Sequence, residues 1–569
     1  MTQLVGAPPP RWRLRDPYAH QNGIPRYPPV LATVLAARGI TTRQQAEAFY
    51  RPHLLPNHDP LLLPGMADAI LRVDRAIREG ELIALYGDFD VDGVTSIAIL
   101  HEGLSPLGAR TLPYIPDRFT EGYGLNFGAI RSLAAAGATL LVTADCGISS
   151  VAEVAYANEL GLDVIILDHH TVPDVLPDAL AAVNPKRIDS PYPFDELAAC
   201  GVAYRFLEVL YDHLGVAFND ADFIDLAALG TVVDVAPLID ENRRIVARGL
   251  EVMRTGGLRP GLAALARVSG VAPERFTSET LGFALGPRMN AAGRLAHANI
   301  ALHLLLERDY RRALNLASEL NALNRERQRQ TEEATQLAEE LLGPADAPLL
   351  FVVTDQIAPG IVGLVASRLA ERRNRPAIVL WRGPEESRAS ARSIPGFDIV
   401  AAIRKEKDLL VRHGGHRSAA GFTVRNEHLD ELRERLTATA AAQLGREPAR
   451  RVIDIDAEAP LAALDGLEVK GLMKFEPTGH GNRKPVLLSR GVRLLDAKPV
   501  GQSGDHLRLA VRDGQVTWRG IAFRQAGAEL DNEVDIVYSL QHDLSGTGVE
   551  LEVLDLAPTA AARPLERGR

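Results

Sequence analysis

Short apolar runs alternate with helical patterns between residues 82 and 183. The runs have the length and content of buried strands, at Leu82–Tyr86, Thr111–Ile115, Leu140–Thr143, Val164–Leu167 and Leu180–Val183. Helical patterns lie between several of them, for example at Phe127–Ala136 and Val151–Leu160. Strands that alternate with helices predict a mostly parallel sheet with helices on both faces. In such sheets, ligand sites form beyond the carboxyl ends of the strands.

The pattern changes after this region. Phe223–Ala236 is an apolar, helix-like run, and Leu281–Leu295 is rich in glycine. Ile300–Leu342 predicts one or two long helices that end in a charged stretch, which is typical of a solvent-exposed bridge between domains. A strand at Leu349–Val353 and a helical run in PGIVGLVASRLAERR then begin a second α/β domain.

Two polar loops, Ser387–Phe397 and Arg412–Phe422, are expected in this second α/β domain. Residues 451–557 are strand-rich, with runs at Arg493–Leu495, His506–Val511, Val516–Phe523 and Val534–Leu540. Turns such as SGD, RDG and SGTG separate these runs, and the pattern predicts a small β-barrel of the OB type. The predicted fold class is therefore a multidomain α/β protein with a C-terminal OB-like barrel.

These changes of pattern also predict the domain boundaries. We expect a Pro-rich arm at 1–45, a first α/β domain at 46–255, a helical connector at 256–345, a second α/β domain at 346–450 and a barrel at 451–557. The tail, 558–569, is expected to be flexible.

Composition narrows the class of protein. The chain has 569 residues, of which 46% are hydrophobic and 24% charged, as in ordinary globular proteins with several domains. A formal net charge of −10 argues against a generally basic nucleic-acid coat but allows a local basic groove. Two cysteines cannot form a disulfide framework. We expect neither a signal peptide nor a membrane span of about 18 apolar residues, and therefore a cytoplasmic protein.

Acidic and imidazole side chains follow three of the predicted strands. They are Asp88, Asp90 and Asp92 after the first strand, Asp145 after the third, and Asp168, His169 and His170 after the fourth. Because the carboxyl ends of parallel strands meet at one edge of a sheet, we expect these groups to lie together. Asp234 lies in the apolar run Phe223–Ala236 and needs a partner, because an isolated buried carboxylate is costly.

Asp90, Asp92, Asp145, His169 and Asp234 form a set of oxygen and imidazole donors. Such donors suit Mn²⁺ or Mg²⁺, and the histidine favours Mn²⁺. Shared carboxylates can hold two ions about 3.5–4 Å apart, an arrangement that activates water and neutralises charge on a phosphoryl group. A helix N-cap or a solvated turn is the plainer explanation for any single acid, but acids at several strand ends in one register argue against it.

Four motifs, GDFDVDG, TADCGIS, LDHH and GTVVDVAPL, resemble those of the DHH phosphoesterase superfamily in their order and spacing. IPDRFTEGYGLN, GPRMNAAGRL, PGIVGLVASRL, ARSIPGFDI and GGHRSAAGF extend the resemblance to the RecJ family of bacterial single-strand-specific 5′→3′ DNA exonucleases. The resemblance covers nearly the whole chain. It implies a DHH domain, a DHH-associated domain and an OB-like domain. The implied activity is hydrolysis of single-stranded DNA to 5′-mononucleotides in recombination and repair, beside a single-strand binding protein and a RecQ-type helicase. We further expect a monomer.

The resemblance also implies roles for individual residues. Asp90, Asp92, Asp145, His169 and Asp234 match metal-ligand positions, and Asp88, Asp168 and His170 match the remaining polar positions, where we expect catalytic roles. The segments used around the DNA strand and the DHH-associated GGH loop contain Arg118, Arg288, Asn290, Arg294, Ser390, Arg392 and His416. One departure is Ile357 and Ala358, where the family usually has a Trp-His pair. We expect this to alter a substrate contact but to leave metal binding intact.

Two other functions are weighed against this exonuclease. A DHH phosphodiesterase for short oligonucleotides or cyclic dinucleotides is the main alternative, although a small substrate has no use for an additional barrel. A catalytically silent scaffold, like the replication-fork relatives of the superfamily, would have lost ligands that this chain retains.

Overall fold

The computed structural model describes residues 10–16, 24–343, 347–445, 450–501, 504–528, 530–543, 548–561 and 565–567. The chain divides into two compact units. The first unit comprises Glu47–Arg327 and Phe475–Arg483, and the second comprises Met1–Ala46, Gln328–Lys474 and Lys484–Arg569. Among the described residues, no helix combines the length and apolar character that a membrane span needs.

The first unit contains a five-stranded sheet in the order β3-β2-β4-β5-β6, and all of its pairings are parallel. The strands are β2 (Leu82–Gly87), β3 (Arg110–Tyr114), β4 (Ala138–Ala144), β5 (Asp163–Leu167) and β6 (Ala181–Val183). This confirms the prediction of a parallel sheet, and the strand bounds differ by only a few residues from those expected.

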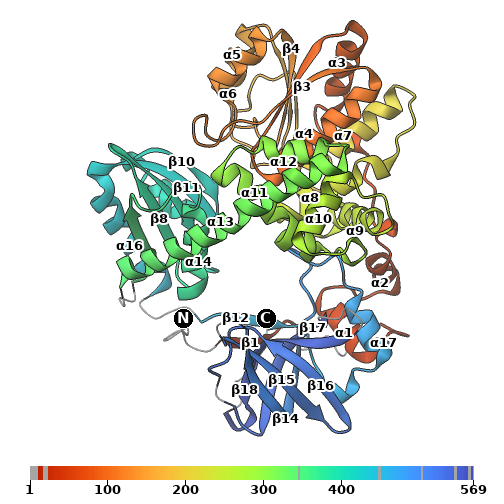
Figure 1. The fold of residues 1–569 in the computed structure, drawn as a ribbon, viewed down its shortest axis with the longest axis vertical. Helices are drawn as coiled ribbons and strands as arrows, with labels where there is room; N and C mark the ends of the chain where they lie inside the picture. The colour runs from red at the N-terminus through yellow and green to blue at the C-terminus, as the bar shows by residue number, and fades with distance from the viewer. Residues whose placement is uncertain are drawn as a thin grey trace. The chain divides into compact units, whose positions relative to one another are not determined.

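Helices cover both faces of this sheet (Figure 1). On one face lie α3 (Met66–Glu79), α4 (Val91–Leu104) and α7 (Ala199–His213), and on the other α5 (Phe127–Ala135) and α6 (Val151–Glu159). Both faces of the sheet are apolar because successive side chains of a strand such as β2 point to opposite faces. Ile83 and Leu85 join the core beneath α4, whereas Ala84 and Tyr86 join the core beneath α5.

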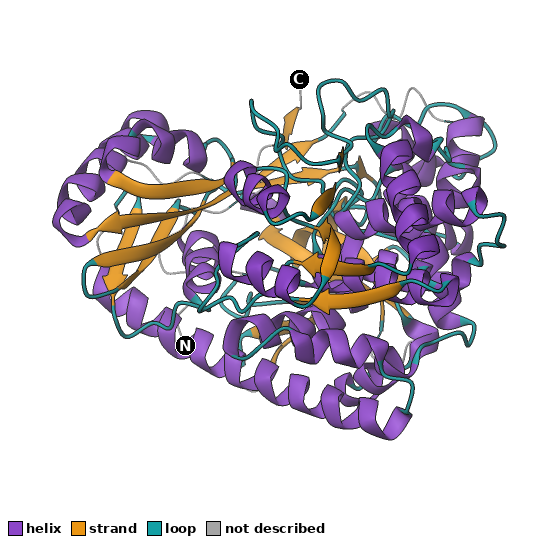
Figure 2. Ribbon diagram, turned by 90° about the horizontal axis from the view of Figure 1, so that it is seen from above, coloured by secondary structure: helices purple, strands orange, loops and turns teal. Residues whose placement is uncertain are grey.

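The rest of the first unit is helical. Its helices are α8 (Ile224–Val233), α9 (Asp240–Arg254), α10 (Pro260–Ser269), α11 (Gly286–Leu295) and α12 (Asn299–Leu306), with a π-helical turn at Thr280–Leu285. The glycine-rich stretch thus forms helix. α13 (Tyr310–Leu342) is a 33-residue helix, the long uninterrupted one in Figure 2, and residues of both units belong to it. The expectation of one or two long helices at Ile300–Leu342 is met by one long helix, α13, which the short α12 precedes.

The second α/β domain contains a five-stranded sheet in the order β10-β11-β9-β8-β7. Its strands are β7 (Leu350–Thr354), β8 (Ala377–Arg382), β9 (Glu386–Arg392), β10 (Leu410–His416) and β11 (Ala419–Arg425), and its helices are α14 (Val362–Arg373), α15 (Ile399–Lys405) and α16 (Leu429–Leu444). The expected polar loops were wrong in large part, because β9, β10 and β11 form antiparallel pairs there. β9 and β10 carry many polar side chains, whereas Phe422 and Val424 of β11 join the hydrophobic core, and partner strands satisfy the main chain of all three.

The C-terminal domain is a closed barrel of five strands. They are β14 (Leu487–Val500), β15 (His506–Asp513), β16 (Val516–Ala522), β17 (Glu533–His542) and β18 (Val549–Pro558). Pairing runs β14-β15-β16-β18-β17, and β17 pairs again with β14. The predicted OB-like barrel is confirmed, with β18 as a strand that the sequence pattern had not revealed.

Two segments from the first and last parts of the chain lie beside this barrel domain in one small parallel sheet. β1 (Arg11–Leu14) pairs with β12 (Val452–Ile455) and with β19 (Leu565–Arg567). Trp12 is fully buried and its Nε1–H donates to Asp555 Oδ2 at 2.7 Å. Part of the tail that was expected to be flexible is therefore a strand, whereas residues 562–564 and 568–569 lie outside the described residues.

Candidate metal centre

Three carboxylates follow β2 at the edge of the parallel sheet. Asp88 and Asp92 are buried. Asp90 is the N-cap of α4, and its Oδ1 accepts the main-chain N–H groups of Asp92 (2.9 Å) and Gly93 (3.1 Å). Asp90 therefore does cap a helix, but only one of its two carboxylate oxygens is used for the cap, and the other is available as a metal ligand. A Cβ at Gly93 would come within 2.5 Å of the Asp88 main chain, so this turn requires glycine.

The turns after β4 and β5 carry the next donors. Asp145 follows β4 with a φ of 63°, and its N–H donates to the Leu167 carbonyl at 3.0 Å. Asp168 follows β5, and its Oδ1 accepts the N–H groups of His169 (2.8 Å) and His170 (3.1 Å). Main-chain hydrogen bonds thus orient both turns toward the same edge of the sheet.

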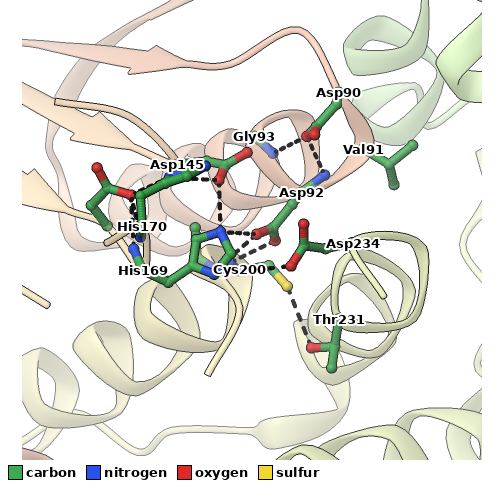
Figure 3. A network of polar contacts seen from close by, with 12 residues as sticks. Asp90, Val91, Asp92, Gly93, Asp145, His169, His170, Cys200, Thr231 and Asp234 are labelled. Carbon is green, nitrogen blue, oxygen red and sulfur yellow. Dashed lines mark hydrogen bonds and ion pairs between the residues drawn. The ribbon is translucent and has the colours of Figure 1, made fainter. Parts of the chain in front are cut away.

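The side chains converge on His169 (Figure 3). Its Nε2 lies 3.1 Å from Asp145 Oδ1 and 3.7 Å from Asp92 Oδ2. Its Nδ1 lies 3.9 Å from Asp234 Oδ2, which projects from the C-terminal end of α8. Three overlapping sets have donor atoms within 4.8 Å of one another: Asp92–His169–Asp234, Asp88–Asp90–Asp145 and Asp145–His169–His170. All five expected ligands are therefore together, while their roles as ligands stay predictions.

Asp88 supplies an independent test of whether this site suits a cation. Its Oδ1 is buried and has no hydrogen-bond partner in the part of the chain that the structure describes. Burial, and then the charge of Asp90, raise the pKa of Asp88 well above its ordinary value. A buried carboxylate oxygen without a donor is costly, and coordination to a hard divalent cation would satisfy it. The donor set therefore fits Mn²⁺ or Mg²⁺.

The pKa values of the other acids divide them into two kinds. Burial, and then neighbouring carboxylates, raise the pKa of Asp92 to about 6, that of Asp234 to about 9 and that of Asp145 well above its ordinary value. A bound cation reverses this effect, because it favours the charged form of each ligand. Burial also raises the pKa of Asp168, but the hydrogen bond and charge of His170 outweigh it and lower the value to about 2.

Helix α7 holds Asp92 in place. The N–H of Ala199 donates to Asp92 Oδ2 at 2.8 Å, and the N–H of Cys200 donates to Oδ1 at 2.9 Å. Both donors belong to the first turn of α7, where main-chain N–H groups lack partners within the helix. Helix α8 comes equally close, because a Cβ at Gly230 would lie 3.0 Å from Asp92 Oδ1. Sequence reasoning missed these residues, although a glycine within an apolar helix indicates close packing.

The loop after β3 brings a second group of side chains to the centre. His170 Nδ1 lies 2.7 Å from Asp168 Oδ1, and its Nε2 lies 3.1 Å from the hydroxyl of Tyr123. The guanidinium of Arg118 lies over the ring of Phe89, 4.7 Å from its centroid. Burial lowers the pKa of Arg118. Tyr123 and Phe89 were not singled out from the sequence, although the quoted motifs contain both.

Three of the expected DNA-contact residues lie on α11: Arg288, Asn290 and Arg294. Arg288 Nε donates to Asn321 Oδ1 of α13 at 3.0 Å. A Cβ at Gly293 would come within 2.8 Å of the Phe89 carbonyl oxygen. Helix α11 therefore packs directly on the turn between β2 and α4 that carries three of the acids.

The other expected contacts belong to the second unit. Ser390 and Arg392 lie on β9, where Arg392 donates to Ser390 Oγ at 3.1 Å. His416 lies on β10 and is exposed. Across the sheet His416 pairs with Ala419, which in turn pairs with Arg392. The imidazole and the guanidinium therefore come from the same level of one sheet.

Ile357 and Ala358 mark the departure from the family pattern. Ile357 is fully buried in the core with residues of β7, β8 and α14, whereas Ala358 is exposed. The position where the family usually has histidine thus faces solvent within its own unit.

Three family models match the chain in order. The DHH family N-terminal domain matches residues 82–231, the DHHA1 domain residues 346–442 and the RecJ OB domain residues 455–547. The chain is 39% identical to the single-stranded-DNA-specific exonuclease RecJ of Bacillus subtilis, over 85% of this chain and 62% of that protein. It therefore spans less than two thirds of that relative. It is 36% identical to RecJ of Salmonella typhimurium, over 90% of this chain and 92% of that protein.

Solved structures agree with these matches. The chain is similar to the crystal structure of RecJ from Thermus thermophilus in complex with Mn²⁺, with a TM-score of 0.83 and 31% sequence identity. That similarity covers 98% of this chain and 80% of the other. With its three domains in this order and relatives that match over most of its length, the chain belongs to the RecJ family of single-stranded-DNA-specific exonucleases.

Proposed function

We propose that this protein hydrolyses single-stranded DNA from the 5′ end and releases 5′-mononucleotides, in DNA recombination and repair. The observation that carries the proposal is the meeting of Asp90, Asp92, Asp145, His169 and Asp234 at one edge of the sheet, in a chain of the RecJ family. These five residues would hold two Mn²⁺ or Mg²⁺ ions, with Asp88 available to the same cations through its buried oxygen. Bound there, two such ions supply charge neutralisation at the phosphoryl group and an activated water.

His170 has the second part in the proposed reaction. Burial lowers the pKa of His170, but its hydrogen bond to Asp168 outweighs this and raises the value, which favours the protonated ring. A protonated imidazole held in place by a carboxylate can donate to a phosphoryl oxygen as negative charge develops. Asp168 is suited to this role, because its low pKa keeps it charged. We assign His170 and Asp168 to charge stabilisation.

The proposed DNA contacts are arginines and small polar groups. Arg118 and the α11 residues Arg288, Asn290 and Arg294 would contact phosphates in the first unit, since guanidinium groups bind phosphate in bidentate fashion. Ser390, Arg392 and His416 would do so in the DHHA1 domain. The barrel would bind a further stretch of strand, as OB domains do.

Digestion of end-labelled DNA tests the proposal. Single- and double-stranded oligonucleotides labelled at either end are incubated with the protein and Mn²⁺, Mg²⁺ or EDTA. We expect early release of a labelled mononucleotide from the 5′ end of single strands, and no digestion in EDTA. Asp145→Asn should lose about 100-fold or more of this activity, because it removes a charged donor that belongs to two of the three overlapping donor sets. Asp212→Asn, an exposed acid on α7, is the matched control and should act as wild type.

Several outcomes would contradict the proposal. Release from the 3′ end, or a wild-type rate for Asp145→Asn in Mn²⁺, would exclude this mechanism. Faster hydrolysis of dinucleotides than of long strands would instead favour a phosphodiesterase for short oligonucleotides or cyclic dinucleotides.

The proposal extends to partners and location on the strength of the family resemblance alone. We infer that the protein is a cytoplasmic monomer that acts beside a single-strand binding protein and a RecQ-type helicase. Sedimentation of the pure protein tests the monomer, and stimulation of digestion on coated or partly unwound DNA tests the two partners.

A further inference from the structure

The 116–125 loop, which joins β3 to α5, presents two side chains to the metal centre. The hydroxyl of Tyr123 lies 3.1 Å from His170 Nε2, and the guanidinium of Arg118 lies 4.7 Å from the centroid of the Phe89 ring. Phe89 also contacts Tyr123 edge to face, with centroids 6.2 Å apart. Phe89 lies between Asp88 and Asp90 in the chain, so these contacts place Arg118 and Tyr123 beside the metal centre. The position of the loop therefore sets where the two side chains lie relative to the centre.

The carboxylate of Glu121 ties this loop together. Its Oε2 accepts the N–H of Asp117 at 2.7 Å. Its Oε1 accepts the hydroxyl of Tyr114 at 2.5 Å and the side-chain amide of Asn126 at 3.2 Å. Tyr114 is the last residue of β3 and Asn126 is the N-cap of α5. One side chain therefore links the start of the loop, the end of the loop and the edge of the sheet.

Other anchors of the loop act on smaller parts of it. Asp117 Oδ1 accepts the main-chain N–H groups of residues 119 and 120 and the Thr120 hydroxyl, so it shapes its own turn. The hydroxyl of Tyr86 donates to the Gly124 carbonyl at 2.8 Å, and its ring stacks on that of Tyr114. Only the Glu121 carboxylate, among these anchors, joins both halves of the loop.

We propose that Glu121 is a positioning residue that sets Arg118 and Tyr123 for the reaction. Its carboxylate holds the loop so that Arg118 meets the 5′ phosphate of the strand and Tyr123 orients His170. Glu121 acts indirectly, through Arg118 and Tyr123. Within the described chain, the hydrogen bonds of its carboxylate go to Tyr114, Asp117 and Asn126, which shape the loop. This inference rests on the proposed function, because the contact between Arg118 and phosphate is part of that proposal.

The variant Glu121→Gln tests the inference with almost no change in volume. In this variant an amide nitrogen replaces one of the two carboxylate oxygens. It then faces an N–H or O–H donor that the oxygen now accepts, so at least one hydrogen bond to the loop is lost. We expect KM for a 5′-phosphorylated strand to rise about tenfold, the size of one hydrogen bond to a charged group. The preference for 5′-phosphorylated over 5′-hydroxyl strands should fall by a similar factor, and kcat should fall as His170 loses its orientation.

Metal binding separates this role from general damage. Calorimetric titration with Mn²⁺ should give wild-type affinity and stoichiometry for Glu121→Gln, because none of the proposed ligands is touched. Glu159→Gln, an exposed acid at the end of α6, is the matched control and should leave KM, kcat and the end preference unchanged.

Tyr114→Phe provides a second and milder variant, because it removes only the hydroxyl that donates to Glu121. Its effect should have the same direction, and the double variant should be no worse than Glu121→Gln alone, since both changes break one network. Folded Glu121→Gln and Tyr114→Phe proteins that keep the wild-type end preference would overturn the inference. A wild-type protein that releases nothing from 5′ ends would overturn the proposed function, and this inference with it.

Discussion

Gly230 is the residue through which α8 approaches the metal centre, and its replacement by alanine gives the sharpest test of the site's construction. A Cβ at this position would lie 2.4 Å from Thr95 Oγ1, 2.5 Å from Cys200 Sγ and 3.0 Å from Asp92 Oδ1. All three neighbours are buried, so none can turn away into solvent. The added methyl group must therefore push α8 and Asp92 apart.

The expected magnitudes differ for stability and for activity. Overpacking a core costs about 1–3 kcal/mol, and alanine regains about 1 kcal/mol over glycine in a helix, so the net loss of stability is about 0–2 kcal/mol. Asp92 is held by N–H donors at 2.8 and 2.9 Å, and it cannot move far without losing them. A displacement of about 1 Å at a reacting centre costs about 100-fold in rate. Activity should therefore fall much more than stability.

The assay is kcat on 5′-labelled single-stranded DNA at saturating Mn²⁺, with Mn²⁺ affinity by calorimetry and melting temperature measured alongside. Gly201→Ala in α7 is the matched control, because its Cβ would meet Leu197 Cδ2 at 3.4 Å and nothing closer. That variant should fold and act as wild type. A folded Gly230→Ala protein with wild-type Mn²⁺ affinity and kcat would refute the idea that close approach of α8 places Asp92.

Three further predictions concern other contacts of the first unit. In EDTA the melting temperature should fall as pH rises from about 6 to about 9, because the pKa of Asp234 rises from an ordinary 3.8 to about 9 in the folded protein. The stabilising contribution of the protonated group is therefore present at low pH and lost as pH rises. Asp234→Asn should flatten this slope, and an equal slope in both proteins would contradict the prediction. Tyr123→Phe should lower kcat about three- to tenfold in single-turnover assays while Mn²⁺ binding persists, since His170 loses one hydrogen bond; an unchanged kcat would count against it. Arg243→Leu should lower the free energy of unfolding in urea by about 3 kcal/mol or more, because this buried guanidinium donates hydrogen bonds to four main-chain carbonyls. A loss below about 1 kcal/mol would contradict this prediction.

The parallel sheet and its line of donors could be predicted because both depend on local pattern. Apolar runs of strand length, with helices between them, leave few topologies other than a parallel sheet. In such a sheet the residues that follow each strand must meet at one edge, and Asp145 and His169 do so although they lie on different turns. Here the order of residues was enough to infer which side chains are neighbours.

Prediction failed where pairing between strands, and not side-chain pattern, decides the conformation. The segments Ser387–Phe397 and Arg412–Phe422 are rich in Ser, Arg, Gly and His, which suggested loops. In the structure β9, β10 and β11 exchange antiparallel hydrogen bonds over much of this length. Leu565–Arg567 likewise becomes a strand because β1, more than 500 positions earlier, provides its partner. A local pattern carries no information about a partner that far away in the chain.

The sequence by itself determined the kinds of donor at this site, their places at strand ends and, through its motifs, the family. Only the tertiary structure decided what holds those donors. Asp92 receives its hydrogen bonds from the start of α7, 107 and 108 residues further along, and His170 meets Tyr123 from a loop 47 residues before it. Such contacts depend on how helices and loops pack across a folded core, and packing of that kind leaves no periodic trace in the order of amino acids.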